Sequence, residues 1–303
     1  MMELSVVIPT AGKWSRLERT LRGLAAAAPR PERFEVVLVL DGVAAPADLR
    51  DHGLPLRTVA LPERAGRGAA RNAGLRAARG SISVLLDDDI VTTPRFLAAH
   101  LEAQRRAPSL CRGPIRELPA LVHVEELEPF ALKAELSERA AARIERVART
   151  IVAALDEPEA CWDQHGSASR LEREGQAALQ AGRRAVSWIA FAGANLSAPT
   201  AWWLEAPFDE RPGTRWGLED LGRALAFALA GRPLTEAPEA RGLHLTHPRG
   251  AWKQDLELTH CCIDFLPPRS AASVLQYLYE EIDLDALEAA LAELFHSPES
   301  LAC

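Results

Sequence analysis

Short apolar runs alternate with amphipathic segments through the first third of the chain. Each apolar run ends at a proline, at Asp-Gly or at a group of acids, which is typical of a strand followed by a turn. The segments between them carry apolar residues at helical spacing, as with Leu17, Leu21 and Leu24. This alternation predicts an α/β fold with a mostly parallel sheet and helices on both faces. The predicted strands are residues 4–8, 34–40, 56–61 and 82–86, and the predicted helices are residues 14–27, 68–78 and 93–106.

The rest of the chain is mainly helical in character. Residues 122–155 are charged and alanine-rich, with a helical period and no strand signal, and residues 156–182 are polar and irregular. We expect this stretch to form a helical insertion that covers the open edge of the sheet. The remaining predicted elements are a strand at residues 185–191, a helix at 218–230, a short strand at 242–246 and a helical tail at 252–295.

Composition limits the classes of function. The 303 residues include 42 acids and 35 bases, a formal net charge of −7, so the chain has no overall positive field to attract nucleic acid. Five cysteines without a Cys-x-x-Cys pair argue against a disulfide framework or a zinc site and favour reduced thiols in a cytosol. The chain starts in a predicted strand without a basic leader, and no run is long and apolar enough to cross a bilayer. We therefore expect a soluble, cytoplasmic protein.

Three consecutive aspartates, Asp87, Asp88 and Asp89, follow directly on the apolar run of residues 82–86. Carboxylates gathered at the end of a buried strand repel one another unless water or a cation compensates them. Mg²⁺ and Mn²⁺ prefer oxygen ligands and are often shared between carboxylates and substrate phosphates. Open α/β sheets bind ligands at the carboxyl ends of their strands. The triplet alone leaves two interpretations open, a metal–diphosphate site and a solvated turn.

Further motifs stand in a fixed order around the aspartates, and each of them alone is weak evidence. They are Val6-Val7-Ile8-Pro9-Thr10, Asp41-Gly42, Arg71-Asn72-Ala73-Gly74-Leu75, Gly193-Ala194-Asn195-Leu196-Ser197, Phe208-Asp209-Glu210, Trp216-Gly217-Leu218-Glu219-Asp220-Leu221 and His244-Leu245-Thr246-His247. As an ordered set across about residues 4–247, they resemble the family 2 glycosyltransferases of GT-A fold. That family moves a sugar from a nucleoside diphosphate sugar to an acceptor.

The resemblance divides the chain and also shows two departures from the family's pattern. Many relatives have a polar residue where this chain has Ile90, and a glycine where it has Leu218. That glycine allows close backbone approach to the sugar, so the family's acceptor pocket shape is not carried over to this chain. The implied organisation is a nucleotide-sugar-binding half at residues 1–120, a helical insertion near the acceptor site at 121–184, an acceptor-binding and catalytic half of the same domain at 185–249, and a helical extension at 250–303.

The resemblance also implies a donor site at the strand ends. Asp89 would bind a Mn²⁺ or Mg²⁺ ion that bridges the two phosphates and offsets the charge of the leaving group. His247 is the first candidate for a second ligand and His244 the next, because imidazole suits Mn²⁺ better than Mg²⁺. For either histidine an ordinary polar role near a loop stays open, as does a plain Asp-Gly turn for Asp41. The implied donor contacts are Pro9, Thr10, Asp41, Arg71, Asp87, Asp88 and Asn195.

On the acceptor side, Glu219 and Asp220 open the helix predicted at residues 218–230. The resemblance implies that Asp220 takes the acceptor proton, that Glu219 orients the acceptor, and that the anomeric carbon is inverted. Acids in a first helical turn are also common without any catalytic role. The expected partners are a UDP-sugar, by default a hexose, and a small molecule, peptide or glycan as acceptor, but no nucleic acid. One tryptophan among Trp188, Trp202, Trp203 and Trp216 is a candidate platform for the acceptor sugar.

Two rival functions stay open. A nucleotidyltransferase also joins an α/β sheet to carboxylate-bound Mg²⁺, and Thr10-Ala11-Gly12-Lys13 is a faint version of its glycine-rich basic loop. A catalytically silent sugar-nucleotide-binding scaffold would keep the fold and the donor pocket but lack a working base. Transfer releases a nucleoside diphosphate, nucleotidylation releases pyrophosphate, and a scaffold releases neither.

Overall fold

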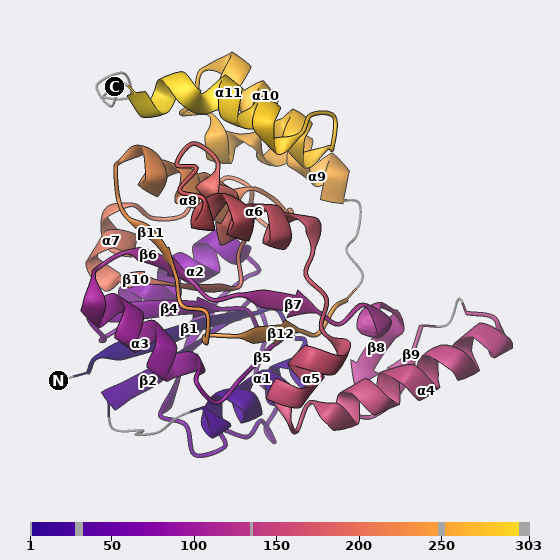
Figure 1. The fold of residues 1–303 in the computed structure, drawn as a ribbon. Coiled ribbons are helices and arrows are strands. Elements are labelled where there is room, and N and C mark those ends of the chain that lie inside the picture. Colours follow the sequence, from indigo (N-terminus) through magenta and orange to yellow (C-terminus); the bar gives the residue numbers. More distant parts are fainter. Residues whose placement is uncertain (1, 28–32, 134–135, 248–251, 297–303) are drawn as a thin grey trace.

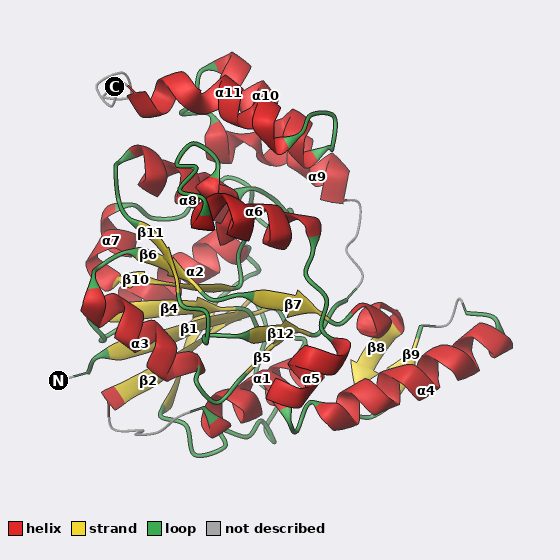
Figure 2. Ribbon diagram, viewed as in Figure 1, coloured by secondary structure: helices red, strands yellow, loops and turns green. Residues whose placement is uncertain are grey.

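The structure is a computed structural model that describes residues 2–27, 33–133, 136–247 and 252–296. Its centre is a seven-stranded sheet with helices on both faces (Figures 1 and 2). The spatial order is β11-β6-β10-β4-β1-β2-β3. These strands are β1 (Leu4–Thr10), β2 (Phe34–Asp41), β3 (Leu56–Leu61), β4 (Ile82–Leu86), β6 (Leu110–Arg112), β10 (Asn195–Pro199) and β11 (Leu234–Glu236).

The four early strands run parallel, as the alternation of strands and helices predicts. In β1, Val6 lies opposite residues of both neighbouring strands, β2 and β4. Its side chain packs with the cluster under α1 (Trp14–Ala26), whereas Val7 packs with the cluster on the side of α2 (Arg67–Ala77). The carboxyl ends of β1, β2 and β4 therefore meet at one edge, where Thr10, Asp41 and the aspartate triplet stand.

A smaller sheet brings the late histidines to this edge. It has the order β5-β12-β7, made of β5 (Ile90–Thr92), β12 (Gly242–His244) and β7 (Ile115–Glu117). In this sheet His244 pairs with Ile90 on one side and Glu117 on the other. The backbone N–H of Leu245 donates to the carbonyl oxygen of Asp89 at 2.8 Å. Strand pairing thus places residues 244–247 directly beside the aspartates.

The segment after β7 corrects two predictions. Residues 122–155 are not wholly helical, because η2 (Pro119–His123) is followed by a hairpin of β8 (Val124–Leu127) and β9 (Phe130–Leu132) before α4 (Glu138–Ala154) begins. Residues 156–182 are not irregular, because they form α5 (Pro158–His165) and α6 (Arg170–Gln180). The hairpin strands are too short to show alternation, and the two polar helices bury few residues, such as Cys161 and Trp162 of α5.

Most of this insertion packs on the small sheet. Leu118, Ile151 and Trp162 form a core with Val91 and Leu243 of β5 and β12. The insertion was predicted to cover the open edge of the large sheet. Among its described helices, α6 alone bonds an edge strand of that sheet, through Gln176 and Glu236 of β11 at 3.1 Å. The covering role predicted for the whole insertion therefore applies to α6 only.

The strand predicted at residues 185–191 is instead η3 (Ser187–Phe191), a 3₁₀ helix, and the neighbouring strand β10 starts at Asn195. A short apolar run that is buried on every side does not distinguish strand from helix, and here Trp188 and Phe191 are both fully buried. α3 (Phe96–Arg106) starts slightly later than predicted, with Arg95 rather than Thr93 at the N-cap position.

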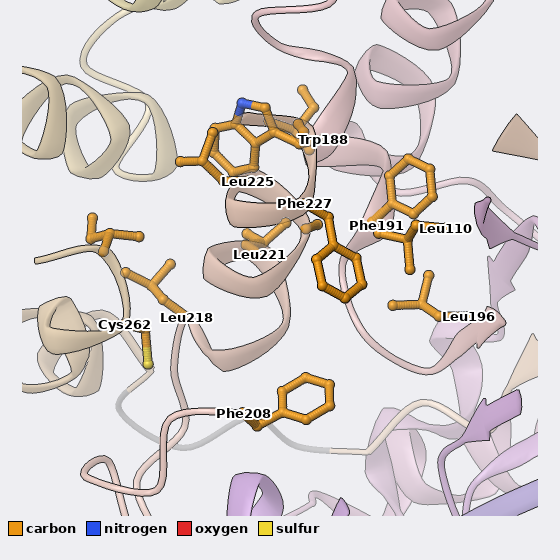
Figure 3. Close-up of a cluster of buried hydrophobic side chains, with 14 of the residues drawn as sticks. Leu110, Trp188, Phe191, Leu196, Phe208, Leu218, Leu221, Leu225, Phe227 and Cys262 are labelled. Atoms are coloured by element: carbon orange, nitrogen blue, oxygen red, sulfur yellow. The ribbon is translucent and has the colours of Figure 1, made fainter. Parts of the chain in front are cut away.

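The predicted late helices are present. Figure 3 shows Leu218, Leu221 and Leu225, at and along α8 (Glu219–Leu229), in one buried cluster with Trp188 and with Cys262 of η4. In Figure 1 the C-terminal helices lie together as one layer beyond α8 and α6. The other late helices are α7 (Thr200–Glu205), α9 (Trp252–Thr259), η4 (His260–Ile263), α10 (Pro268–Leu278) and α11 (Leu284–His296).

Candidate active site

A cavity of about 410 Å³ opens at the carboxyl ends of β1, β2 and β4. Its far wall is made by the start of α8, by the segment that follows β12, and by residues of α6 and the C-terminal helices. The structure therefore gathers residues that the sequence spreads across more than two hundred positions. The predicted site residues that line the cavity are Pro9, Thr10, Asp41, Arg71, Asp87, Asp88, Asp89, Glu219, Asp220, His244 and His247.

Asn195 is the exception among the predicted donor contacts. It is buried in β10, where its amide oxygen bonds His100 Nε2 at 2.7 Å and its amide nitrogen donates to the carbonyl oxygen of Ala240 at 2.7 Å. Its neighbours Gly193 and Ala194 line the cavity instead. Because successive side chains of a strand point to opposite faces, one position decides whether a residue meets the ligand or the core. We leave Asn195 out of the candidate donor pocket.

Asp41 organises the loop that follows β3. Its carboxylate accepts backbone N–H groups from Ala65 at 2.7 Å and from Gly66 at 3.0 Å. Gly66 has φ +94°, and a Cβ there would lie 1.7 Å from the carbonyl oxygen of Gly213, so only glycine fits. Two oxygens offer about four acceptor positions, so Asp41 keeps capacity for a ligand N–H beyond these structural bonds.

Asp88 faces the loop that follows β1. Its carboxylate accepts the Thr10 hydroxyl at 2.7 Å, and the same hydroxyl oxygen accepts the backbone N–H of Gly12 at 3.2 Å. Burial together with the adjacent charge of Asp89 raises the pKa of Asp88 to about 7. The Thr10–Asp88 bond therefore ties the loop after β1 to the end of β4.

Asp89 and the two late histidines form a compact set of ligand atoms. His244 Nε2 lies 3.5 Å from one Asp89 oxygen, and His247 Nε2 lies 3.3 Å from the other. One ligand atom from each of the three residues falls within 4.8 Å of the others. The predicted proximity of Asp89 to His244 and His247 is confirmed by these distances, although the histidines lie more than 150 positions after Asp89 in the sequence.

A fourth carboxylate holds His244 in place. Glu117 of β7 accepts from His244 Nδ1 at 2.6 Å and from the Thr246 hydroxyl at 2.9 Å. Burial disfavours a charged ring, but Asp89 and Glu117 outweigh it and raise the pKa of His244 to about 10. A carboxylate on the far nitrogen of a histidine is a common way to orient a metal-binding imidazole, and here it leaves Nε2 directed at Asp89.

A lysine side chain reaches two members of this set. Lys13 Nζ lies 2.7 Å from Asp89 Oδ2, 2.9 Å from His247 Nε2 and 3.8 Å from Asp88 Oδ1. Lys13 directly precedes α1, after Gly12 with φ +103°. Burial opposes ionisation of Asp89, yet the imidazoles and Lys13 outweigh it and lower the pKa of Asp89 well below its ordinary value.

Arg71 connects the early aspartates to the late helix. It is almost fully buried in α2 and forms ion pairs of 3.0 Å with Asp87 and with Glu219. Its guanidinium also lies 5.5 Å from the centre of the Phe208 ring. Arg71 is therefore an interior charge held by two carboxylates and not a solvated helix arginine. Glu219 is buried and paired, so its position at the start of α8 is set by this bridge.

Of the two carboxylates at the start of α8, Glu219 is paired with Arg71, whereas Asp220 forms no ion pair within the part of the chain that the structure describes. One oxygen accepts the N–H of Leu221 at 2.7 Å. Burial and the charge of Glu219 raise the pKa of Asp220 to about 7, although Arg71 opposes the shift. A Cβ on Gly193 would lie 2.8 Å from the other Asp220 oxygen, so the backbone of that loop comes close to this carboxylate. A pKa near 7 is suited to a general base.

The remaining wall comes from the insertion and the C-terminal region. Arg170 at the start of α6 donates to the carbonyl oxygen of Tyr277 at 3.1 Å and stacks on its ring at 4.6 Å. This contact brings Leu278 and Glu280 to the cavity. Of the four candidate tryptophans, Trp216 lines the cavity, whereas Trp188 and Trp203 are fully buried in the core.

Sequence reasoning missed three residues of this site. Lys13 appeared only as part of a faint basic loop, and Glu117 carried no signal, because its role arises from strand pairing with His244. Arg170 was recoverable, since Ser169-Arg170-Leu171-Glu172 matches a capping box. The Ser169 hydroxyl accepts the N–H of Glu172, as that motif predicts, and it marks the start of α6.

A family model and curated proteins of known name match this chain in sequence. Residues 5–116 match the profile described as "Glycosyl transferase family 2". Validoxylamine A glucosyltransferase of Streptomyces hygroscopicus subsp. limoneus is 31% identical over 265 residues, which cover 81% of this chain and 52% of that protein. Dodecaprenyl-phosphate galacturonate synthase of Rhizobium johnstonii is 32% identical over 120 residues, 37% of this chain and 36% of that protein.

Solved structures of similar fold include TarS and a mannosyltransferase. TarS of S. aureus superposes with a TM-score of 0.54 at 14% identity, over 94% of this chain and 45% of that chain. Mannosyltransferase PcManGT of Pyrobaculum calidifontis, in complex with GDP-Man and Mn²⁺, also gives 0.54 at 14% identity, over 99% of this chain and 71% of that chain. TarS residues 1–349 in complex with UDP-GlcNAc give 0.51 at 14% identity, over 97% and 80%.

The chain belongs to glycosyl transferase family 2 and has the GT-A fold. It spans about half the length of the curated relatives it matches over most of its own length. In the described part of the chain, none of the helices combines the length and the apolar character that crossing a membrane requires.

Proposed function

We propose that the chain is an inverting, metal-dependent glycosyltransferase that moves a sugar from a nucleoside diphosphate sugar to an acceptor hydroxyl or similar nucleophile. One observation carries the proposal: a single cavity of about 410 Å³ contains the Asp87–Asp89 group, the histidine pair and the Glu219–Asp220 pair. The first two suit a cation with a diphosphate, and the third suits proton removal from an acceptor. A UDP-hexose is the default donor.

The nucleotide would lie across the ends of the early strands. Pro9, Thr10 and Asp41 line this part of the cavity, with Asp87 and Asp88 beside them. Asp41 keeps acceptor capacity for a base N–H, as argued above. The UDP-GlcNAc complex of TarS and the GDP-Man complex of PcManGT support a nucleotide-sugar donor for a protein of this fold.

A divalent cation fits the residues that surround Asp89. One carboxylate and two imidazoles, with ligand atoms within 4.8 Å of one another, make an oxygen–nitrogen donor set that suits Mn²⁺ better than Mg²⁺. Asp89, His244 and His247 would hold the ion, and Glu117 would orient His244. When bound, such an ion offsets the negative charge that builds on the diphosphate as the glycosidic bond breaks.

Asp220 is the proposed base. Its carboxylate takes the proton of the acceptor hydroxyl while the acceptor oxygen forms its bond to the anomeric carbon. The bond from that carbon to the phosphate oxygen breaks on the opposite face, and its electron pair leaves with the nucleoside diphosphate. Attack opposite the leaving group inverts the anomeric centre. Glu219, held by Arg71, borders the same part of the cavity and would orient the acceptor, with Trp216 as a platform.

The test is a product assay on the purified chain. UDP-glucose, UDP-GlcNAc and GDP-mannose are each incubated with MnCl₂ and a panel of hydroxylated acceptors, and released nucleotide is quantified. We expect nucleoside diphosphate in the presence of Mn²⁺, none after chelation and none from Asp89→Ala, with Asp285→Asn on the surface of α11 as the matched control. Magnetic resonance of the product reports the anomer.

Other products would point elsewhere. Pyrophosphate in place of nucleoside diphosphate would support a nucleotidyltransferase. Tight binding of a nucleotide sugar with neither product, across the whole acceptor panel, would support a silent binding protein. Retention of the donor's anomeric configuration would contradict the inverting role of Asp220.

A further inference from the structure

Lys13 contacts two of the three proposed metal ligands directly. Its ammonium lies 2.7 Å from Asp89 Oδ2 and 2.9 Å from His247 Nε2, and these two ligand atoms are themselves 3.3 Å apart. An ammonium and a divalent cation at this position would lie within a few ångströms of each other, where like charges repel strongly. The two cations therefore compete for the same carboxylate and the same imidazole nitrogen.

The backbone before Lys13 is fixed by hydrogen bonds, whereas its side chain is partly exposed to solvent. Thr10 accepts the N–H of Gly12 while donating to Asp88, and this holds the loop at the start of α1. One turn further on, Arg16 donates to the carbonyl oxygens of Val124 and Leu245 at 2.8 and 3.3 Å. The Lys13 side chain, by contrast, is 37% exposed, and four methylene groups joined by rotatable bonds separate its charge from the backbone.

We infer that Lys13 is a built-in competitor of the divalent cation, which fills the metal position until a nucleoside diphosphate arrives. The inference rests on the proposed function for its metal site. While Lys13 is in place, the cation alone binds weakly, because it must displace an ammonium from Asp89 and His247. A diphosphate adds negative charge that accommodates both cations, so nucleotide and metal bind together.

This coupling has a measurable form. If nucleotide strengthens metal binding by some factor, metal strengthens nucleotide binding by the same factor. Removing the Lys13 charge should tighten binding of the metal alone and so shrink that factor. Lys13 is thus a positioning residue for the order of ligand binding, separate from any residue that contacts the reacting atoms.

The experiment titrates MnCl₂ into protein and follows free Mn²⁺ by electron paramagnetic resonance, with and without UDP at fixed pH. The variants are Lys13→Met, which removes the charge at similar length, and Lys13→Arg, which keeps a positive charge. Lys133→Met is the matched control, because Lys133 follows β9 and does not line the cavity. Circular dichroism checks that each variant is folded.

We expect Lys13→Met to bind Mn²⁺ at least about tenfold more tightly than the wild type without UDP, with a smaller gain from UDP. Lys13→Arg and Lys133→Met should stay close to the wild type. Equal or weaker Mn²⁺ binding by Lys13→Met would overturn the competitor role. If the competitor role is overturned in this way but Asp89→Asn abolishes Mn²⁺ binding, the proposed metal site stands without a competing lysine. If Asp89→Asn binds Mn²⁺ like the wild type, or if no variant binds it even with UDP, the metal part of the proposed function fails as well.

Discussion

Two groups of carboxylates face one cavity, and the cations that compensate them differ in how firmly they are held. The Asp87–Asp89 group meets Lys13, whose side chain is 37% exposed. The Glu219–Asp220 pair meets Arg71, whose side chain is 2% exposed and bonded to both Asp87 and Glu219. Lys13 directly precedes α1 and reaches the carboxylates from a partly solvated position, whereas Arg71 is enclosed by the core.

The difference indicates two separate uses of positive charge. An ammonium that can be displaced suits a position that a ligand must enter, because its displacement exposes the carboxylate to the incoming cation. A buried guanidinium suits a position that must keep its shape, because loss of one partner would leave charges stranded in the interior. The proposed donor side is therefore adjustable at Asp89, and the proposed acceptor side is rigid, as is Asp87 through its bond to Arg71.

Asp220→Asn should have the largest effect and separates the two groups by function. Turnover should fall by roughly 10²- to 10⁴-fold, because the acceptor hydroxyl loses its base. Donor affinity should stay nearly unchanged, since Asp220 lies outside the Asp89 group. Steady-state kinetics and calorimetry with the nucleoside diphosphate measure the two quantities. Unchanged turnover would remove Asp220 as the base, and Asp285→Asn serves as the control for a carboxylate on the surface.

The variants Arg71→Met and Lys13→Met compare how much each cation contributes to the free energy of unfolding. We expect Arg71→Met to lower the free energy of unfolding by about 3–5 kcal/mol, because buried Glu219 loses its partner. Lys13→Met should lower it by about 1 kcal/mol or less, since its ammonium is partly solvated. Urea unfolding at neutral pH without metal or nucleotide gives both values. Equal losses would contradict the distinction between a removable and a fixed cation.

The pH dependence of turnover probes how Arg71 acts on Asp220. Burial and the charge of Glu219 raise the pKa of Asp220 to about 7. Arg71 lowers this pKa, whereas Asp87 raises it further. A base works when deprotonated, so turnover should rise as the pH increases towards about 7, roughly tenfold per unit on the acid side, and level off above it. With Arg71→Met the midpoint should move to higher pH. A profile that is flat from pH 5.5 to 8.5 at saturating donor and metal would exclude this titration.

Leu218→Gly should produce the smallest change and concerns the rigid side. Leu218 is buried at the N-cap of α8 and lines the cavity, and its φ of −92° does not require glycine. Glycine allows an acceptor to approach the backbone, so we expect a severalfold change in the relative rates with different acceptors. Leu218→Ala is the matched control, since it also loses the large side chain and its packing energy. Identical acceptor profiles for all three proteins would show that Leu218 does not shape the pocket.

Much of the donor side was predictable because it depends on local sequence. The strands at residues 34–40, 56–61 and 82–86 were located closely, and the acids that follow them stand at strand ends as expected. The hairpin β8–β9 and the 3₁₀ helix η3 were not, because short apolar runs take their form from what packs on them. Asn195 shows most clearly what local sequence does not predict. It was expected to contact the ligand, but its side chain lies in the core and bonds His100.

The order of motifs along the chain determined the family resemblance and the kinds of chemical group in the site, since strand ends and first helical turns depend on neighbouring residues. Only the tertiary structure decided which charges meet. Lys13 and His247 stand 234 positions apart, and Arg71 and Glu219 stand 148 apart. Contacts at such separations follow from how β12 pairs with β5 and β7 and from how the start of α8 meets Arg71 of α2, and no local pattern records that arrangement.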